Sequence, residues 1–177
     1  MSKVLAIDTS TSRSCVAIID GAKVLYSGFR DGATAHGPSL PSLVQEALAV
    51  SDVDEVVVGM GPGPFTGLRV GIAFAQSFAL AREIPVRGVC SLDAIAAQVT
   101  DKDFIITVDA RRKEVYWARY TDGVRVGEPA VNFPADVTGA TIHADLFPNM
   151  VALVNLSGNI IEPMYLRRPD AVATADR

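Results

Sequence analysis

A short apolar run that ends on an acid opens the chain, and together with the two runs after it this feature restricts the fold more than any other. The run covers Val4 to Asp8, and a second apolar run covers Ser14 to Asp20. Asp20-Gly21 is a hairpin-turn signal that leads into a third run, from Lys23 to Phe29. Short apolar runs bounded by turn residues indicate strands. The chain is therefore expected to open with three strands joined by tight connections.

The same order returns in the second half of the chain. Phe104 to Asp109 is again an apolar run that ends on an acid, and Glu114 to Tyr120 is a second run. Asp122-Gly123 then precedes a third run, from Val124 onward. The acid and the Asp-Gly pair are 12 positions apart in the first copy and 13 in the second. Asp-Gly turns are common, so chance is an alternative, but the matching order favours a duplication.

Helical periodicity follows the first three strands. Apolar residues spaced three and four apart predict one helix from Pro38 to Val50 and a second from Thr66 to Arg82. A third helix is expected to begin at Ser91, which is placed as its N-cap. Valine-rich runs predict strands between these helices, at Asp54 to Gly59 and at Val86 to Val89.

The two halves differ in size. The first has the order βββαβαβα within residues 1–100, whereas the second, residues 101–177, shows little clear helix after its strands. Proline and glycine interrupt the segment from Asn132 to Asn159, whose elements the pattern does not place. The sequence thus predicts an α/β protein with an N-terminal lobe of residues 1–100. The C-terminal lobe is expected to be a shortened, reduced copy.

Charge and composition exclude several classes of protein. The net charge is −4 at pH 7, whereas stand-alone nucleic-acid binders are usually basic, so tight unaided binding to DNA or RNA is not expected. No run of about 20 apolar residues occurs, so no membrane span is expected. Cys15 and Cys90 form no CxxC pair and are expected to be buried thiols in a reducing cytosol. A cytoplasmic protein is therefore expected.

No complete catalytic or metal-binding set is recognisable in the sequence. His36 and His143 are the two histidines, and the chain has no HExxH or GxSxG motif. Each histidine is expected to be a surface or helix-capping residue. The sequence therefore predicts no metal site and no catalytic residue.

Asp8, Thr9 and Ser10 follow the first strand and allow two interpretations. A carboxylate and two hydroxyls at a turn can hold a metal-bound water and phosphate oxygens. The same residue types also satisfy backbone N–H groups in an ordinary turn. The residue types alone favour the ordinary turn, and a vestigial phosphate loop is the alternative.

The loop from Gly61 to Gly71 joins a buried strand to the second helix. It is not a P-loop, because no Gly-Lys-Ser or Gly-Lys-Thr follows, and Thr66 stands where a dinucleotide fingerprint has its third glycine. Pro62 and Pro64 offer no N–H donors, so the loop is expected to be a rigid turn with Thr66 as the helix cap.

The second helix is apolar on two sides. One stripe can face a sheet, and in so small a chain the other is expected to meet a partner unless the first helix covers both. Small residues along the helix would allow close approach of another helix. The two stripes are Leu68, Ile72, Ala75 and Ala79, and Val70, Phe74, Phe78 and Ala81.

A basic segment lies in the middle of the chain. Arg111, Arg112 and Lys113 are followed closely by Tyr116 and Trp117. Such a pattern can contact RNA through phosphate groups and stacking. In an exposed hairpin the same pattern gives one solvated and one packed face. That second interpretation is favoured, and RNA contact through the three cations is the alternative.

Several segments together resemble the TsaB family, also called YeaZ, whose members act in the synthesis of N6-threonylcarbamoyladenosine on bacterial tRNA. The resemblance spans most of the chain. It is carried by Ala6-Ile7-Asp8-Thr9-Ser10, His36, Gly61 to Gly71, Asp109-Ala110-Arg111 with Glu114-Val115-Tyr116, and Pro163 to Arg168.

The resemblance implies the ASKHA fold, the duplicated ribonuclease-H-like architecture of actin and the sugar kinases. It also implies a non-catalytic subunit that pairs with TsaD, which carries the transferase site and the metal, and is joined by TsaE, an ATPase. The complex modifies adenosine 37 of tRNAs that read ANN codons. No cofactor is expected in the isolated chain, because it has no Gly-Gly pair for an adenosine motif. ATP or ADP is expected only at the junction of the complex.

On this chain the resemblance places the partner surface on the first two helices. In the absence of TsaD, two copies of the chain are expected to form a dimer through the same surface. Contact with tRNA is expected only within the complex. A small ASKHA-type ATPase or kinase that uses Asp8 is the alternative function. The expected interface residues are Leu40, Leu43, Val44, Ala47, Leu68, Val70, Gly71, Ile72, Phe74, Ala75 and Phe78.

Overall fold

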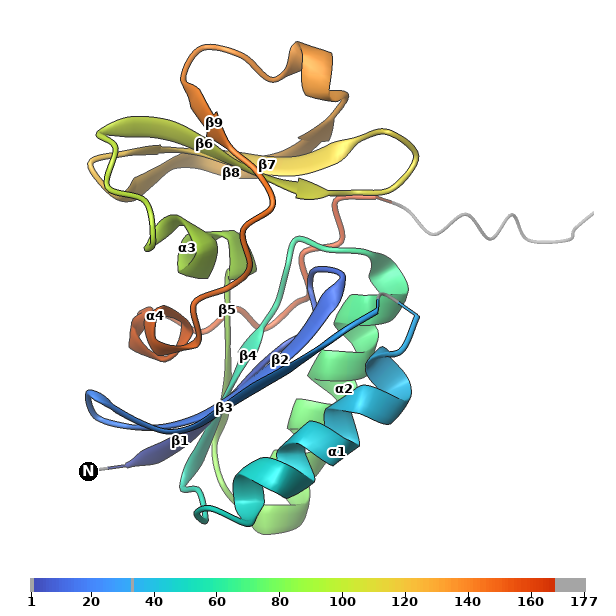
Figure 1. Ribbon diagram of the computed structural model, residues 1–177, viewed down its shortest axis with the longest axis vertical. Coiled ribbons are helices and arrows are strands. Elements are labelled where there is room, and N and C mark those ends of the chain that lie inside the picture. Colours follow the sequence, from blue (N-terminus) through green and yellow to red (C-terminus); the bar gives the residue numbers. More distant parts are fainter. Residues whose placement is uncertain (1, 33, 168–177) are drawn as a thin grey trace, which may run out of the picture.

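The computed structural model describes residues 2–32 and 34–167, and within them the chain forms two β-sheets (Figure 1). The predicted strands are confirmed to within two residues at either end. The strands are β1 Lys3–Asp8, β2 Arg13–Asp20, β3 Lys23–Asp31, β4 Glu55–Gly59, β5 Val86–Val89, β6 Asp103–Asp109, β7 Val115–Thr121, β8 Val124–Asn132 and β9 Thr141–His143. The helices are α1 His36–Leu48, α2 Phe65–Arg82, α3 Ser91–Ala96 and α4 Met150–Asn155, with a 3-10 turn η1 at Pro134–Asp136.

The first sheet has five strands in the order β3-β2-β1-β4-β5. β2 is antiparallel to β1 and β3, whereas β4 is parallel to β1 and β5. α1 and α2 cover one face of this sheet and α4 covers part of the other (Figure 1). β1 is buried on both faces for this reason, which explains its continuous apolar run.

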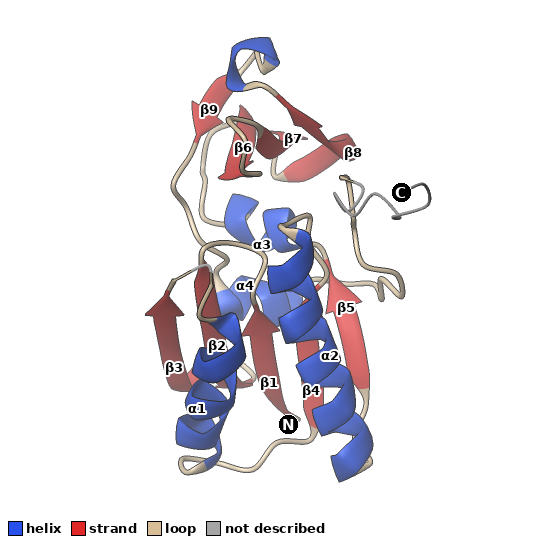
Figure 2. Ribbon diagram, turned by 90° about the vertical axis from the view of Figure 1, so that its right-hand side faces the viewer, coloured by secondary structure: helices blue, strands red, loops and turns tan. Residues whose placement is uncertain are grey.

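The second sheet repeats this arrangement. Its order is β8-β7-β6-β9, with β7 antiparallel to β6 and β8 and with β9 parallel to β6. β6 to β9 therefore correspond to β1 to β4, and this is the duplicated ribonuclease-H-like architecture of the ASKHA fold. α3 packs on the face of the second sheet that is turned toward the first lobe, so α3 and α4 lie between the two sheets (Figure 2).

Asp8 at the end of β1 and Asp109 at the end of β6 are not structurally equivalent, although the sequence repeat aligned them. Val4 and Ala6 face α4 in β1, so Asp8 lies on the face of its sheet that is turned toward the middle of the molecule. In β6 the residues on the corresponding face are Phe104, Ile106 and Val108. Asp109 therefore lies on the opposite face, and Val108 occupies the place of Asp8.

Helix starts differ from the sequence predictions by one or two residues. α1 begins at His36 instead of Pro38, and α2 begins at Phe65 instead of Thr66. Thr66 is therefore not the helix cap, because Pro64 occupies that position. Ser91 is the first residue of α3 and Cys90 is its N-cap, and the Ser91 hydroxyl donates to Asp8 and accepts from the Gly61 amide.

The C-terminal part of the chain returns to the first lobe. α4 packs through Met150 and Leu153 on the first sheet. Arg87 of β5 donates to the carbonyl oxygens of Val154 and Leu156 at the end of α4 and pairs with Glu55. The segment after α4 then runs along β5, where the Ile160 amide donates to the Gly88 carbonyl at 2.8 Å. α4 and the segment after it, which the sequence analysis assigned to the C-terminal lobe, thus pack on the first sheet.

The second lobe is reduced because its β8–β9 connection contains η1 where the β3–β4 connection contains α1. Among the described residues no helix covers the outer face of the second sheet. Val126 and Ile142 on that face are 54% and 45% exposed. No described helix is both long enough and apolar enough to cross a membrane.

Candidate functional site

The turn after β1 is closed around Asp8. Its side chain has no exposed surface. One carboxylate oxygen accepts hydrogen bonds from the Ser10 amide at 2.8 Å and the Ser10 hydroxyl at 2.7 Å, and the other accepts from the Ser91 hydroxyl at 2.6 Å. Burial raises the pKa of the Asp8 carboxyl, and the bonds from Ser91 and Ser10 oppose that rise. Both oxygens of Asp8 are thus occupied by the protein itself.

The start of α2 fills the space beside this turn. The Thr9 hydroxyl donates to the Gly67 carbonyl at 2.7 Å and accepts from the Gly71 amide at 3.1 Å. A Cβ atom at Gly63 would lie 2.5 Å from the Ser10 carbonyl oxygen. The glycines of the loop therefore let α2 approach the turn closely, which the residue pattern alone did not show. The structure favours the interpretation of residues 8–10 as a packed turn.

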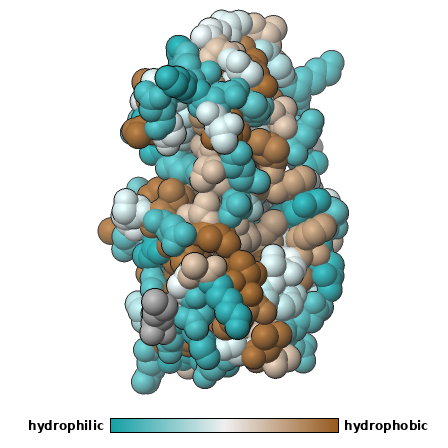
Figure 3. Space-filling model, turned by 60° about the vertical axis from the view of Figure 1, so that its left-hand side comes forward, coloured by the Kyte–Doolittle hydropathy of each residue, from teal (hydrophilic) through white to brown (hydrophobic). Residues whose placement is uncertain are grey.

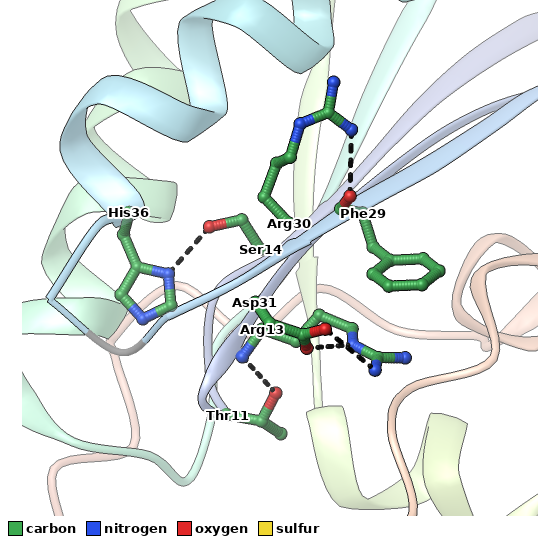
Figure 4. A network of polar contacts seen from close by, with 7 residues as sticks. All are labelled: Thr11, Arg13, Ser14, Phe29, Arg30, Asp31 and His36. Atoms are coloured by element: carbon green, nitrogen blue, oxygen red, sulfur yellow. Dashed lines mark hydrogen bonds and ion pairs between the residues drawn. The ribbon is translucent and has the colours of Figure 1, made fainter.

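His36 is buried, contrary to the expectation of a surface residue. It is the first residue of α1, is 4% exposed, and its Nδ1 forms a 2.7 Å hydrogen bond with the Ser14 hydroxyl (Figure 4). Burial lowers the pKa of the His36 ring, the Asp8 carboxylate and the Thr11 backbone oppose that change, and the positive charge of Arg111 adds to it. His143 is only partly buried, lies in the edge strand β9 and hydrogen-bonds with Asp101.

A cavity of about 810 Å³ lies between the two lobes, and we call it the inter-lobe cleft. The first lobe contributes the β1–β2 turn, the start of α1 and the start of α2. The second lobe contributes the end of β6 and the turn after it, and the C-terminal segment closes one side. The lining includes Thr11, Ser12, His36, Phe65, Thr66, Val108, Asp109, Arg111, Arg112, Tyr116, Asp145, Phe147, Tyr165 and Arg167.

The turn after β6 has a strained backbone. Arg111, Arg112 and Lys113 have φ angles of 66°, 53° and 66°, which non-glycine residues rarely adopt in succession. The Arg111 amide donates to the Asp109 carboxylate at 2.9 Å, and the Ala110 amide donates to the Glu114 carbonyl at 2.9 Å. Such outliers persist only where surrounding contacts hold them, and they concentrate at functional sites.

Arg167 holds this turn from outside. Its guanidinium pairs with the Glu114 carboxylate and donates to the Ala110 carbonyl at 3.2 Å. Within the same segment the Tyr165 ring lies 4.7 Å from the Phe65 ring of α2, and the Met164 amide donates to the Met60 carbonyl. Residues 164–167 therefore connect the start of α2 to the turn after β6 across the cleft.

Most of the expected partner-interface residues point into the chain's own core. Val70, Phe74 and Phe78 are partly exposed while packing against that core, and Leu80, which was not included, is 81% exposed. α1 and α2 thus use their main apolar stripes to cover the first sheet, and Val70, Phe74 and Phe78 form a narrower, half-buried strip at the margin of α2, which we call the outward strip. The expected interface residues that are buried are Leu40, Leu43, Val44, Ala47, Leu68, Gly71, Ile72 and Ala75.

A second hollow of about 250 Å³ lies between β2, β3 and the start of α4. Hydrophobic side chains gather at mid-height on this side of the molecule, with hydrophilic ones around them (Figure 3). Arg13 closes one end, because its guanidinium lies 3.9 Å from the Phe29 ring and 3.8 Å from the Phe147 ring and pairs with Asp31. Burial raises the pKa of the Cys15 thiol in this hollow to about 12, so Cys15 is a packing residue and not a nucleophile.

Within the described part of the chain, no three His, Cys, Asp or Glu side chains come close enough to hold a metal ion. The inter-lobe cleft was not predicted from the sequence, because its walls include segments as far apart in the chain as Thr11 and Arg167. The basic segment was a signal for it, because Arg111, Arg112 and Tyr116, which the sequence analysis named together, all line the cleft. Arg168, at the end of the resembling segment, lies outside the described residues.

The chain is similar to several proteins of known sequence. The family model described as TsaD, tRNA N6-adenosine threonylcarbamoyltransferase, matches residues 30–168. An uncharacterized protein of Mycobacterium tuberculosis is 45% identical over 200 residues, which cover 97% of this chain and 94% of that protein. The tRNA threonylcarbamoyladenosine biosynthesis protein TsaB of Escherichia coli is 36% identical over 127 residues, which cover 67% of this chain and 54% of that protein. The chain thus spans about half the length of this named relative.

Two solved structures share the fold over most of the chain. YeaZ from Pseudomonas aeruginosa superposes with a TM-score of 0.74 at 28% identity and covers 87% of this chain and 89% of that chain. A second structure, described as an uncharacterized protein with similarity to peptidase YEAZ from the same organism, has a TM-score of 0.80 at 27% identity. It covers 94% of this chain and 100% of that chain.

Proposed function

The chain belongs to the TsaD-type family, in its TsaB (YeaZ) branch, and from that premise we propose that it is a non-catalytic subunit of a complex that makes N6-threonylcarbamoyladenosine on tRNA. In this proposal it pairs with TsaD, and TsaE joins the pair in the cytoplasm. The modified base is adenosine 37 of tRNAs that read ANN codons. The named relatives support the pathway, since their names state tRNA threonylcarbamoyladenosine biosynthesis.

The closed turn around Asp8 is the observation that carries the accessory role. An ATPase or kinase of this fold needs a carboxylate open to a metal-bound water at the end of the first strand. Here both Asp8 oxygens accept hydrogen bonds within the protein, and the side chain has no exposed surface. No observation favours the alternative of an enzyme that uses Asp8.

The outward strip of α2 supports a partner surface. Phe74 and Phe78 stack with their ring centroids 6.2 Å apart, and Leu80 is 81% exposed on the same helix. Two adjacent, half-buried aromatic rings suit a surface that another protein covers, and Leu80 adds a separate exposed apolar side chain on another side of the same helix. We assign this strip to TsaD in the complex and to a second copy of the chain in isolation. ATP or ADP would bind only where the subunits meet.

The test is a reconstituted tRNA modification reaction with threonylcarbamoyl-adenylate synthase, TsaD, TsaE and tRNA, with and without this chain. We expect modified adenosine only when the chain is present. An Asp8→Asn variant that remains folded is expected to support the reaction fully, because Asp8 has a structural role. Modification that does not depend on the chain would contradict the proposal, and loss of activity in the folded Asp8 variant would point to catalysis by Asp8.

A further inference from the structure

We propose that the inter-lobe cleft holds one nucleotide unit of a single RNA strand, with its phosphate on Arg111 and its base against the rings of Phe65 and Tyr165. The inference rests on the proposed function only for the choice of RNA, in place of a free nucleotide, as the source of that unit. The cleft, Arg111 and the two rings are properties of this chain alone.

Arg111 is the phosphate-binding group. Its side chain lines the cleft, and no carboxylate in the described part of the chain forms an ion pair with it. Across the cleft lie the hydroxyl-bearing residues Thr11, Ser12 and Thr66, which can donate to phosphate oxygens. His36 also lines the cleft, and its Nδ1 is already hydrogen-bonded to the Ser14 hydroxyl.

The strained turn explains how Arg111 comes to line the cleft. Three successive residues in the left-handed region turn the chain back on itself directly after β6. Asp109 holds the Arg111 amide, and Arg167 holds the Ala110 carbonyl and Glu114. These contacts keep the turn in place without using the Arg111 guanidinium. Arg111 is thus presented at the cleft by a clamped backbone.

The aromatic rings supply a surface for a base. Phe65 and Tyr165 line the cleft with their ring centroids 4.7 Å apart, and Tyr165 is 38% exposed. Bases stack on such rings with little sequence preference. The volume of about 810 Å³ falls in the range of sites for single small ligands, so the cleft suits one unstacked nucleotide and not a duplex.

The opposing charges limit the affinity. Asp109 and Asp145 also line the cleft, and the whole chain carries a net charge of −4. Arg112 and Arg167 line the cleft as well, so the two carboxylates offset part of the attraction of the cations for phosphate. We therefore expect weak binding of one nucleotide unit that weakens further as salt is raised.

The experiment uses the full chain and a five-nucleotide single-stranded RNA with 2-aminopurine at its centre, at low salt. Stacking quenches 2-aminopurine, so binding in the cleft is expected to lower its fluorescence. Arg111→Glu should weaken binding at least tenfold. Lys23→Glu, the same charge change at the exposed β2–β3 turn, should change it less than twofold. Tyr165→Ala should remove most of the quenching.

Arg111→Gly is the second variant, because glycine adopts a φ of 66° without strain and removes the charge. Arg111→Gly should weaken RNA binding as Arg111→Glu does, while the midpoint of its thermal unfolding stays at the wild-type value. Equal weakening by Arg111→Glu and Lys23→Glu, or binding without quenching, would overturn the inference. The monophosphate of 2-aminopurine riboside is the second probe. If it binds as tightly as the RNA, the site stands and its source is a free nucleotide.

The two proposals fail separately. If the chain supports no tRNA modification yet binds RNA through Arg111, the proposed function is wrong and the site stands. If modification depends on the chain while RNA binding does not depend on Arg111 or Tyr165, the site is wrong and the function stands.

Discussion

Asp8 and the glycines around it show how single residues close a site that the fold would otherwise leave open. Asp8 accepts three hydrogen bonds from Ser10 and Ser91, and Gly59 lies so close that a Cβ atom there would overlap its carboxylate. Each partner comes from a different element. The carboxyl at the end of β1 has therefore become part of the core.

Burial of Asp8 makes stability depend on pH. Its folded pKa is raised above the ordinary value of 3.8, so the folded chain binds the proton more tightly than the unfolded chain. Stability from this group is therefore greatest below pH 3.8 and falls as pH rises through the raised pKa. Within that window the loss is about 1.4 kcal/mol per pH unit. Asp8→Asn should remove it.

The measurement is urea unfolding of the wild type and Asp8→Asn at a series of pH values. The free energy of unfolding of the wild type, relative to the variant, should fall with rising pH and then level off. A constant difference across the series would show that the carboxyl does not titrate differently in the folded state.

Gly71 and Gly37 form a matched pair for testing close packing. Both lie in helices, but a Cβ atom at Gly71 would overlap the Thr9 hydroxyl, whereas at Gly37 nothing lies within 4 Å. Gly71→Ala should cost about 1–3 kcal/mol of unfolding free energy through overpacking. Gly37→Ala should cost nothing and gain up to about 1 kcal/mol from helix propensity. Equal effects in chemical denaturation would contradict the close approach of α2 to the turn.

At the scale of elements, α2 serves two surfaces at once. Leu68, Ile72 and Ala75 cover the first sheet, and Phe74 and Phe78 lie at the margin between core and solvent. The sequence predicted two stripes on this helix, and the structure places the first in the core, including Leu68, Ile72 and Ala75, which were also expected at the partner interface. The second stripe is only partly exposed to solvent, because α1 packs beside α2.

Aspartate substitutions on α2 separate packing from partner binding. Phe74→Asp and Phe78→Asp should prevent pairing with TsaD, since a buried unpaired carboxylate costs about 3–5 kcal/mol. Both rings also pack on the core, so these variants should lose stability as well. Leu80→Asp should weaken pairing while leaving the fold intact, because Leu80 is 81% exposed.

Pairing is measured by light scattering or calorimetry with TsaD, and folding by thermal melts. Val24→Asp is the control, since Val24 is 45% exposed on β3 and lines the hollow beside α4, away from α2. If Leu80→Asp binds TsaD as the wild type does, the partner surface lies elsewhere on the chain.

At the scale of the whole molecule, three segments join the lobes. Two of them are the connections on either side of the second lobe, between α3 and β6 and between β9 and α4. The third is the segment that contacts Gly88, Met60 and Phe65 in the first lobe and ends with Arg167 on the turn after β6.

Arg167→Gln should loosen this third connection without unfolding either sheet. The variant loses the ion pair with Glu114, and the turn that carries Arg111 loses its outer support. Amide hydrogen exchange should speed up in residues 110–114 and 164–166, while exchange in β1 and β4 is unchanged. Lys23→Gln serves as the control for charge loss. A uniform change across the chain, or none in residues 110–114, would show that Arg167 does not clamp the turn.

Local patterns were sufficient for most elements of the fold. The strands from Val4 to Phe29 and from Phe104 onward, and both long helices, follow from periodicity and turn residues, which act within a few neighbours along the chain. The resemblance to the TsaB family likewise rests on short motifs, and the comparisons confirm it. α4 and β9 were not predicted, because a helix of six residues and a strand of three residues are too short to show a clear periodicity.

Contacts between distant residues decided the rest. The burial of His36 depends on Ser14 and on Gly67, and the closure of Asp8 depends on Ser91, so neither could be inferred from adjacent residues. The face on which Asp109 lies depends on which sheet surface α3 covers, and one position of register reverses it. The sequence by itself determined the order of the strands and helices, because that order is encoded locally. The tertiary structure alone decided which side chains became core and which line the cleft, because burial is set by neighbours that folding brings together.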